Sequence, residues 1–410
     1  MLPKYRKLNI HITMKKLLML GGGFLQNFVI LKAKELGYCV HCLDANPNAV
    51  GFKTADAHAV INIIDSEACL AYAREQKVDG VLTAATDFGV LTMSYIAQKM
   101  NLPGISYDTA KLIKNKADVR RCLFETKADD TGYSYVIDSI EEIAEILPKI
   151  KFPVMMKPVD GSGSRGASKV ECAEEFVKAA EFAMSGSITK RAVVEPFIVG
   201  REYGVESFVD NGYIHILAVI QKDMTQPPYY AELGHAIPSG LSDDLEAKVK
   251  ECVYKALLAL RVNHGSVNMD LLITKEGNVH IIDVGARMGG NLIGSHIIPI
   301  GTGIDYMGNM IRAAVGDLTN WNPVCEPKPV ATKLLALIPG KVKALPDFDA
   351  LKIIYNVQIE HHLTIGDEIT PYRTNLDGCG YVVSCSSSVE DSINIATIVK
   401  KEIDELIVRE

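Results

Sequence analysis

The chain has 410 residues, 48% of them hydrophobic and 23% charged, which is the composition of an ordinary globular protein with roughly two to three domains. Its net charge of −7 gives no electrostatic case for binding nucleic acid, and no apolar run reaches the about 18 residues that a membrane span requires. The nine cysteines are scattered and odd in number, so we expect reduced thiols and a cytoplasmic protein. The basic stretch 1–13 leads into no signal-peptide hydrophobic region, and we expect it to be a short extension before the first strand.

The segment up to about residue 113 alternates short apolar strands with helical patterns. This rhythm predicts βαβ units and therefore an open parallel sheet. The expected strands are Lys16–Leu20, Tyr38–Asp44, His58–Asn62 and Asp79–Thr83, and the expected helices are Phe24–Leu36, Ser66–Gln76 and Asp87–Met100.

The first of these strands runs into a glycine turn, Gly21 to Gly23, which is a partial dinucleotide-binding fingerprint. Gln26 stands where the fingerprint has its third glycine, although Asp44 lies about where a ribose-binding acid would stand. Two interpretations stay open. Either the turn binds NAD, or the turn and the start of the next helix hold an anionic part of a small substrate.

A helical connector over residues 108–127 is followed by a strand, Lys151–Lys157, that ends in a lysine and enters the loop GSGSRGAS, residues 161–168. Successive backbone N–H groups and hydroxyls in such a loop can wrap phosphates. The loop is no Walker A motif, because the lysine precedes it and no helix follows directly. A flexible linker is the alternative, but tight strand patterns flank the loop, so we favour phosphate binding.

An antiparallel pair of strands is expected next, because Arg201–Asp210 and Tyr213–Lys222 flank an Asn-Gly hairpin turn. Residues 223–239 read as an irregular, proline-rich loop that carries Glu232 and His235. Either this histidine is an ordinary loop residue, or it and Glu232 contact a substrate together with the lysine that ends the second strand. Further expected elements are a strand at Ala192–Phe197 and a serine-capped helix at Ser242–Leu260.

The most informative stretch is GSVNMDLLITKEGNVHIIDVGARMGGN, residues 265–291, which reads as two apolar strands around a short turn. If Glu276 and Gly277 form a two-residue turn, Asp270 lies opposite Asp283, at a typical Cβ separation of about 5 Å. Two carboxylates so close repel each other, and burial makes the repulsion worse. A divalent cation between them would make the arrangement tolerable.

Oxygen ligands suit Mg²⁺, which normally arrives with substrate phosphates. Arg287 follows four residues after the second aspartate and suits phosphate oxygens. Gly285, Gly289 and Gly290 let the backbone approach a ligand closely. The alternative is a hairpin with solvated acids, although the apolar residues beside each aspartate look buried on both faces.

The C-terminal part begins after a helix at Ile304–Val315 and turns to short strands and turns. The expected strands are Ala331–Ile338, Lys352–Glu360 and Gly380–Ser386, and a closing helix is expected at Val389–Leu406. This pattern predicts a small mixed domain.

Taken together, these residues resemble an ATP-grasp ligase over essentially the whole chain. The motifs stand in the family's order and spacing and are specific as a set: Lys116, Lys157 with its glycine-rich loop, Glu195, Glu202, and Asp270 followed by Asp283-x-x-x-Arg287. The N-terminal stretch LGGGFLQN…AKELGYCVHCLDANPNA is similar to the purine-biosynthesis carboxylases and transformylases. The segments 222–238 and 285–290 look more like L-amino-acid ligases.

This resemblance implies an α/β and α+β architecture, the ATP-grasp fold. Residues 1–113 would form an N-terminal open parallel α/β (pre-ATP-grasp) domain. Residues 114–322 would form the ATP-grasp domain, with a lid at about 130–195, and residues 323–410 a small C-terminal mixed domain.

The resemblance also implies a role for each matching residue. ATP would contact the two lysines, the loop, and the residues that meet adenine and ribose: Lys116, Lys157, Ser162, Gly163, Ser164, Glu195, Phe197 and Glu202. Asp270 and Asp283 would hold Mg²⁺, or Mn²⁺ in its place, and Arg287 and Lys222 would act on the transferred group. Substrate contacts would come from Glu232, His235, Gly289 and Gly290.

Two departures from the family pattern stand out at the metal site. The first metal ligand is usually Glu and is the shorter Asp270 here, and the family's common Asn two residues after the second acid is Gly285. We therefore expect one usual ligand to be missing.

The expected function is an ATP- and Mg²⁺-dependent carboxylate–amine ligase that forms an amide or peptide bond through an acyl phosphate and releases ADP and phosphate. Its partners would be small-molecule acids and amines, without nucleic acid or membrane, and the resemblance implies a homodimer. The alternatives are a purine-type carboxylase or formyltransferase of the same fold, a catalytically silent ATP-binding module, or an NAD-dependent dehydrogenase.

Overall fold

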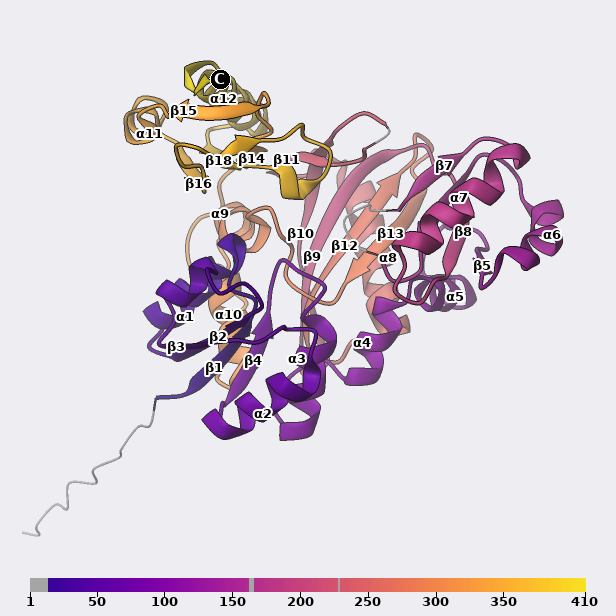
Figure 1. Cartoon of the computed structure of the whole chain (residues 1–410), viewed down its shortest axis with the longest axis horizontal. Coiled ribbons are helices and arrows are strands. Elements are labelled where there is room, and N and C mark those ends of the chain that lie inside the picture. Colours follow the sequence, from indigo (N-terminus) through magenta and orange to yellow (C-terminus); the bar gives the residue numbers. More distant parts are fainter. Residues whose placement is uncertain (1–13, 162–165, 228) are drawn as a thin grey trace, which may run out of the picture.

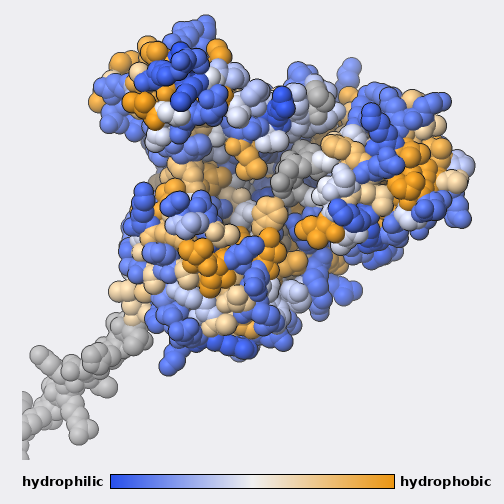
Figure 2. Space-filling view, in the orientation of Figure 1, coloured by the Kyte–Doolittle hydropathy of each residue, from blue (hydrophilic) through white to orange (hydrophobic). Residues whose placement is uncertain are grey.

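The computed structural model describes residues 14–161, 166–227 and 229–410. Figure 1 shows an N-terminal part in indigo, a lid around α7, and a C-terminal part in yellow, joined by a long central sheet. The space-filling view separates these three lobes by hollows (Figure 2). Among the described residues, no helix is long and apolar enough to cross a membrane.

The N-terminal part is an open parallel sheet of order β3-β2-β1-β4, as the sequence predicts. Its strands are fully buried where they are most apolar; Leu17 to Leu20, for example, are 0% exposed. The elements are β1 (Lys16–Leu20), α1 (Phe24–Glu35), β2 (Cys39–Asp44), β3 (Ala57–Val60), α2 (Ser66–Gln76), β4 (Gly80–Thr83) and α3 (Val90–Met100).

One boundary in this part differs from the sequence prediction. Helix α2 has the expected bounds and is capped by the side chain of Asp65, which accepts from the Ala68 N–H. Helix α3 begins at Val90 and not at Asp87, so Asp87 lies on the loop that follows β4. That loop faces the central sheet, which gives Asp87 a place in the site described below.

The lid is a small antiparallel sheet of order β5-β8-β6-β7 with α7 packed on it. Phe176, Ala180 and Ala183 of α7 are fully buried against these strands. Two connecting helices, α4 (Tyr107–Lys114) and α5 (Lys116–Thr126), precede the lid elements β5 (Tyr135–Ile137), α6 (Ile143–Ile146), β6 (Val154–Pro158), β7 (Ser168–Val170), α7 (Ala173–Gly186) and β8 (Ala192–Pro196).

The central sheet has eight strands in the order β13-β12-β9-β10-β11-β14-β18-β16 and runs from the lid side to the C-terminal part (Figure 1). Its first strands and α8, which begins at the Ser242 cap, are β9 (Arg201–Asp210), β10 (Tyr213–Met224), β11 (Glu232–Ile237), α8 (Asp243–Ala259), β12 (Gly265–Ile273) and β13 (Val279–Gly285). The remaining elements are α9 (Ile298–Thr302), α10 (Tyr306–Ala314), β14 (Val330–Leu334), β15 (Gly340–Ala344), α11 (Phe348–Tyr355), β16 (Gln358–His361), β17 (Glu368–Ile369), β18 (Gly380–Cys385), α12 (Val389–Leu406) and β19 (Val408–Arg409).

Two predictions about this sheet are wrong. Residues 232–237 form a strand, not part of an irregular loop, because β10 pairs on one side (Lys222 with His235) and β14 on the other (His235 with Thr332). Residues 348–355 form helix α11, capped by Asp347, where a single strand over 352–360 was expected; only its end is strand β16.

The turn between β12 and β13 differs from the prediction by one residue in register. Thr274 faces Asn278 across the turn, and Ile273 pairs with Val279. A β-bulge between Asp270 and Leu271 then shifts the register by one, so that Asp270 lies opposite Asp283 as expected.

Candidate active site

Two adjoining cavities lie where the lid, the central sheet and the N-terminal part meet. The larger, of about 590 Å³, lies under the lid and is lined by predicted nucleotide contacts that include Lys157, Glu195, Phe197 and Glu202. The smaller is lined by residues that include Asp87 and Arg287. Lys116, Gly161, Asp270 and Asp283 line both cavities and mark where they join.

Lys116 and Asp283 form an ion pair at this junction. Burial alone would raise the pKa of Asp283, but the Lys116 ammonium outweighs it and holds that pKa below its usual range. Lys116 starts α5, where Asn115 caps the helix through the N–H groups of Ala117 and Asp118. The cap therefore sets the direction from which the lysine enters the cavities.

Lys157 pairs with Glu195 at 2.9 Å and donates to the Ile282 carbonyl at 3.3 Å. Glu195 is 5% exposed and also accepts from Arg120 Nε at 2.7 Å. Burial would raise the pKa of Glu195, but Arg120 and Lys157 lower it to about 2. The Glu195 carboxylate thus holds both Lys157 and Arg120 at the wall of the larger cavity.

Arg120 is a site residue that the sequence reasoning missed. Its side chain is only 5% exposed and lies beside the larger cavity, between Glu195 and Asp129. It follows Lys116 by four positions, so both project from one face of α5, and this spacing was the available signal.

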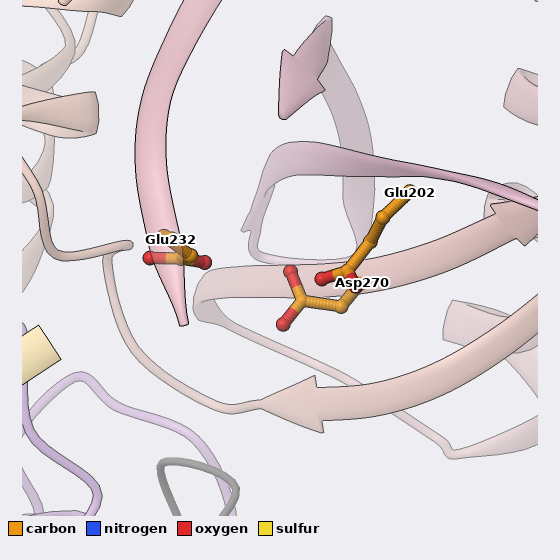
Figure 3. A group of neighbouring side chains, drawn as sticks. All are labelled: Glu202, Glu232 and Asp270. Carbon is orange, nitrogen blue, oxygen red and sulfur yellow. The ribbon is translucent and has the colours of Figure 1, made fainter. Parts of the chain in front are cut away.

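Lys222 is enclosed by three carboxylates that come from three strands of the central sheet. Its Nζ lies 2.8 Å from Glu202, 2.5 Å from Glu232 and 2.9 Å from Asp270. Figure 3 shows these three carboxylates turned toward one another, and one oxygen of each lies within 4.8 Å of the others. Burial would lower the pKa of Lys222, but the three carboxylates raise it well above its usual value, so the ammonium stays charged.

The same cluster shifts the pKa values of two of its acids in opposite directions. Burial raises the pKa of Asp270 to about 6, helped by Glu202 and Glu232 and opposed by Lys222. Glu232 shifts the other way: burial would raise its pKa, but Lys222 and His235 lower it. Asp270 is therefore the acid that gains most from a further cation.

His235 is fully buried, with Nε2 3.8 Å from Glu232 Oε1. Within the described part of the chain, neither ring nitrogen has a hydrogen-bond partner. Because buried polar groups are normally paired, this ring has unused hydrogen-bonding capacity next to the Lys222 cluster. The structure therefore brings the predicted pair Glu232 and His235 together, on β11.

Gly289 and Gly290 lie on the segment after β13. The Gly289 N–H donates to both oxygens of Glu206, at 3.1 and 3.2 Å, so this N–H is engaged inside the protein. A Cβ at Gly290 would lie 3.6 Å from Leu25 and 3.7 Å from Ala85, which puts Gly290 against the N-terminal part. The predicted loop residues Ser162, Gly163 and Ser164 lie outside the described residues, and only the loop ends are placed here.

Gly285 leaves space that other side chains fill. A Cβ at this position would lie 3.1 Å from Arg287 Cζ and 3.3 Å from Asp87 Oδ1. Arg287 Nε donates to Asp87 Oδ1 at 3.0 Å, a contact between the central sheet and the N-terminal part. Sequence reasoning missed Asp87, because its pattern assigned the residue to a helix.

The glycine turn of the N-terminal part, Gly21 to Gly23, is held by hydrogen bonds from neighbouring side chains. Asp44 Oδ2 accepts the Gly22 N–H at 2.8 Å, and Gln26 Nε2 donates to the Ala84 carbonyl at 2.6 Å. Gln26, which stands in place of the third glycine of the dinucleotide fingerprint, thus links the glycine turn to the end of β4 by a hydrogen bond.

The donor set fits a hard divalent cation and a nucleotide triphosphate. Asp270 and Asp283 offer carboxylate oxygens at the junction, and both are held by lysine ammonium groups, which shows that these positions need a cation. The larger cavity is lined by apolar residues, Phe197 among them, and by Lys116, Lys157 and Lys222.

Comparison with known proteins gives the class to which this arrangement belongs. Residues 150–295 match the family model described as ATP-grasp domain. The chain is 25% identical over 334 residues to the uncharacterized protein y4rH of Sinorhizobium fredii, covering 80% of this chain and 68% of that protein. It is 29% identical over 187 residues to the formate-dependent phosphoribosylglycinamide formyltransferase of Methanocaldococcus jannaschii, and this match spans only 48% of that relative.

The solved structure of an L-amino acid ligase from Bacillus licheniformis superposes with a TM-score of 0.83 at 21% identity, covering 97% of this chain and 99% of that one. The protein therefore has the ATP-grasp fold, and both the resemblance and the fold class expected from the sequence are confirmed.

Proposed function

We propose that the protein is an ATP- and Mg²⁺-dependent carboxylate–amine ligase that forms an amide or peptide bond and releases ADP and phosphate. The observation that carries this proposal is the junction of the two cavities. Lys116, Asp270 and Asp283 line both the nucleotide-sized cavity and the cavity that holds Arg287, so a phosphoryl group at the junction would reach a second substrate.

The chemistry follows from charge. A carboxylate is a poor electrophile, and phosphorylation gives it a leaving group that an amine can displace. Bound Mg²⁺ would supply charge neutralisation on the transferred phosphoryl group. Asp270 and Asp283 would hold it, the ammonium of Lys116 would meet phosphate oxygens, and Arg287 would meet the group in transfer.

The ion pairs in this structure suggest that the two lysines exchange partners when metal and nucleotide bind. Lys116 holds Asp283 and Lys222 holds Asp270, so each lysine is free for phosphate only when its aspartate gains another cation. Nucleotide and metal should therefore bind together far better than either alone. The closed lid would keep water from the acyl phosphate.

On the substrate side, Glu232 and His235 lie at one edge of the Lys222 cluster, where Glu232 pairs with Lys222 and the His235 ring has no hydrogen-bond partner among the described residues. An imidazole can bind the polar end of a small acid or amine. The L-amino acid ligase with the same fold fits this view, whereas the formyltransferase relative favours formate as the acid.

The deciding experiment is a screen of ADP and phosphate release over a matrix of carboxylates, formate included, and amines with Mg²⁺-ATP. ADP that depends on both an acid and an amine supports the ligase. Release with formate alone among the acids favours the formyltransferase alternative. No substrate-dependent ADP with any pair favours a silent nucleotide-binding module, and thermal stabilisation by NAD but not by Mg²⁺-ATP favours a dehydrogenase.

Two variants test the assigned roles. Lys157→Ala should abolish turnover and strongly weaken ATP binding, because its ammonium enters the nucleotide cavity. Arg287→Ala should abolish turnover while ATP affinity, measured by calorimetry, changes little, because Arg287 lines only the smaller cavity of the two. Equal losses of ATP affinity would contradict the assignment of Arg287 to the transferred group.

A further inference from the structure

The loop after β4 is fastened to the segment after β13 by its backbone. Ala84 and Met288 form a parallel β-bridge, and the Ala85 N–H donates to the Met288 carbonyl at 3.1 Å. Ala85 adopts φ +56°, a left-handed conformation that is unfavourable for alanine. Strained residues persist where the surroundings hold them, and they gather at functional sites.

Because of these backbone contacts, Asp87 lies next to the end of β13. Side chains at positions 283 and 285 share one face of the strand because they are two residues apart. Asp87 Oδ1 lies only 3.3 Å from the point where a Cβ of residue 285 would stand. The Asp87 carboxylate, together with the Arg287 guanidinium that it holds, therefore occupies the place of a side chain at position 285, one step beyond Asp283 on the same face.

Three aspartates now line the smaller cavity, and each holds one cation of the protein. Lys222 lies 2.9 Å from Asp270, Lys116 is paired with Asp283, and Arg287 lies 3.0 Å from Asp87. Asp87, which comes from the N-terminal part, is thus paired with a cation of the protein in the same way as Asp270 and Asp283 of the hairpin.

We propose that Asp87 is the third protein ligand of the divalent cation that Asp270 and Asp283 would hold. It would supply the oxygen that Gly285 cannot supply, and its transfer to the metal would release Arg287 toward the phosphoryl group. The inference rests on the proposed function, since it assumes that metal and nucleotide meet at the cavity junction. It also makes the metal site incomplete without the N-terminal part.

The test measures Mn²⁺ binding by the full-length protein in the presence of ADP, from the electron paramagnetic resonance signal of free Mn²⁺. Asp87→Ala should weaken Mn²⁺ binding about tenfold or more, the scale on which metal-site substitutions act. ADP affinity without metal should stay unchanged. Asp108→Ala, at an exposed aspartate on α4, is the matched control and should bind Mn²⁺ as the wild type does.

A rescue variant separates a ligand from a mere partner of Arg287. In Asp87→Ala combined with Gly285→Asn, the Asn side chain enters the space vacated by Asp87 once the flexible Arg287 guanidinium, 3.1 Å from the Cβ position, shifts. Its oxygen should then restore most of the Mn²⁺ affinity lost in Asp87→Ala. Unchanged Mn²⁺ affinity in Asp87→Ala would overturn the inference and leave the proposed function standing. Absence of Mn²⁺–ADP binding by the wild-type protein would overturn both, and thermal melting of each variant confirms that it is folded.

Discussion

The side chain of Lys222 is 2% exposed and is the shared partner of Glu202, Glu232 and Asp270. Removing one member of a buried ionic cluster leaves the others uncompensated, which is far more costly than losing a surface pair. The sequence grouped Lys222 with Glu232, but nothing in it indicated that the same ammonium also holds Glu202 and Asp270.

Replacing this lysine tests the cluster. Lys222→Met should lower the free energy of unfolding by about 3–5 kcal/mol, because three carboxylates are left facing one another. Adding Mg²⁺ should recover part of that loss in the variant and little in the wild type. Urea denaturation with and without Mg²⁺ measures both effects. Lys250→Met, at a half-exposed pair with Glu246 on α8, should cost less than about 1 kcal/mol, and a similar loss in both variants would contradict the argument.

Glu206 is a second buried charge, 0% exposed, that accepts from Tyr306, Asn268 and the Gly289 N–H. Burial raises its pKa from 4.5 to about 7, against the opposing effect of these donors. The folded protein therefore holds this proton more tightly than the unfolded chain does. Its contribution to stability is complete below about pH 4.5 and is lost as the pH rises through about 7.

The variant Glu206→Gln removes this titration. Relative to the wild type, its free energy of unfolding should rise by about 2–3 kcal/mol between about pH 5 and about pH 8, since each pKa unit is worth about 1.4 kcal/mol. Denaturant titrations of both proteins across that range measure the difference. Glu326→Gln, at an exposed loop position, should run parallel to the wild type; a flat difference for Glu206→Gln would mean that its carboxylate is already ionised at low pH.

At the scale of elements, local pattern predicted most of the N-terminal sheet and helix α12, because their apolar periodicity is strong. It failed at β11, whose sequence ELGHAI carries no clear alternation; the strand exists because β10 and β14 both pair with it. The facing of Asp270 and Asp283 was predicted from an incorrect turn, and the β-bulge cancels the error. Long-range pairing and bulges leave little trace in a single sequence.

Strand β11 is also tied to the C-terminal part through Asn375. Its Oδ1 accepts the Glu232 N–H at 2.9 Å, and its Nδ2 donates to Glu232 Oε2 at 2.9 Å. Asn375→Ala should therefore speed hydrogen exchange at the Glu232 amide about tenfold, which corresponds to one lost hydrogen bond. Exchange followed by mass spectrometry measures this, with the exposed loop variant Asn322→Ala as control. Unchanged protection at Glu232 would show that β10 and β14 alone hold the start of β11.

At the scale of the molecule, the helices of the N-terminal part do not cover both faces of its sheet by themselves. A parallel sheet needs cover on both faces. Helix α10, which comes some 200 residues later in the chain, packs against α1 and β4 and shares a buried cluster with them (Figure 1). Lys15 and Tyr38 add polar ties to Asp317 just beyond this helix. The part that carries Asp87 is therefore packed against a helix that follows Arg287 in the chain.

Gly80 is where this contact is tightest. A Cβ there would lie 2.4 Å from the Ala314 carbonyl oxygen and 2.8 Å from Val315 Cγ1, so Gly80→Ala must push α10 away from β4. We expect a loss of about 1–3 kcal/mol in stability, the usual cost of overpacking. Faster hydrogen exchange should appear in α10 and β4 but not in α7 of the lid. Gly132→Ala, whose Cβ would make an ordinary contact with Pro196 at 3.7 Å, is the matched control. If exchange rose equally in α7, the lid and the N-terminal part would unfold as one unit, and the sheet would not depend on α10 in particular.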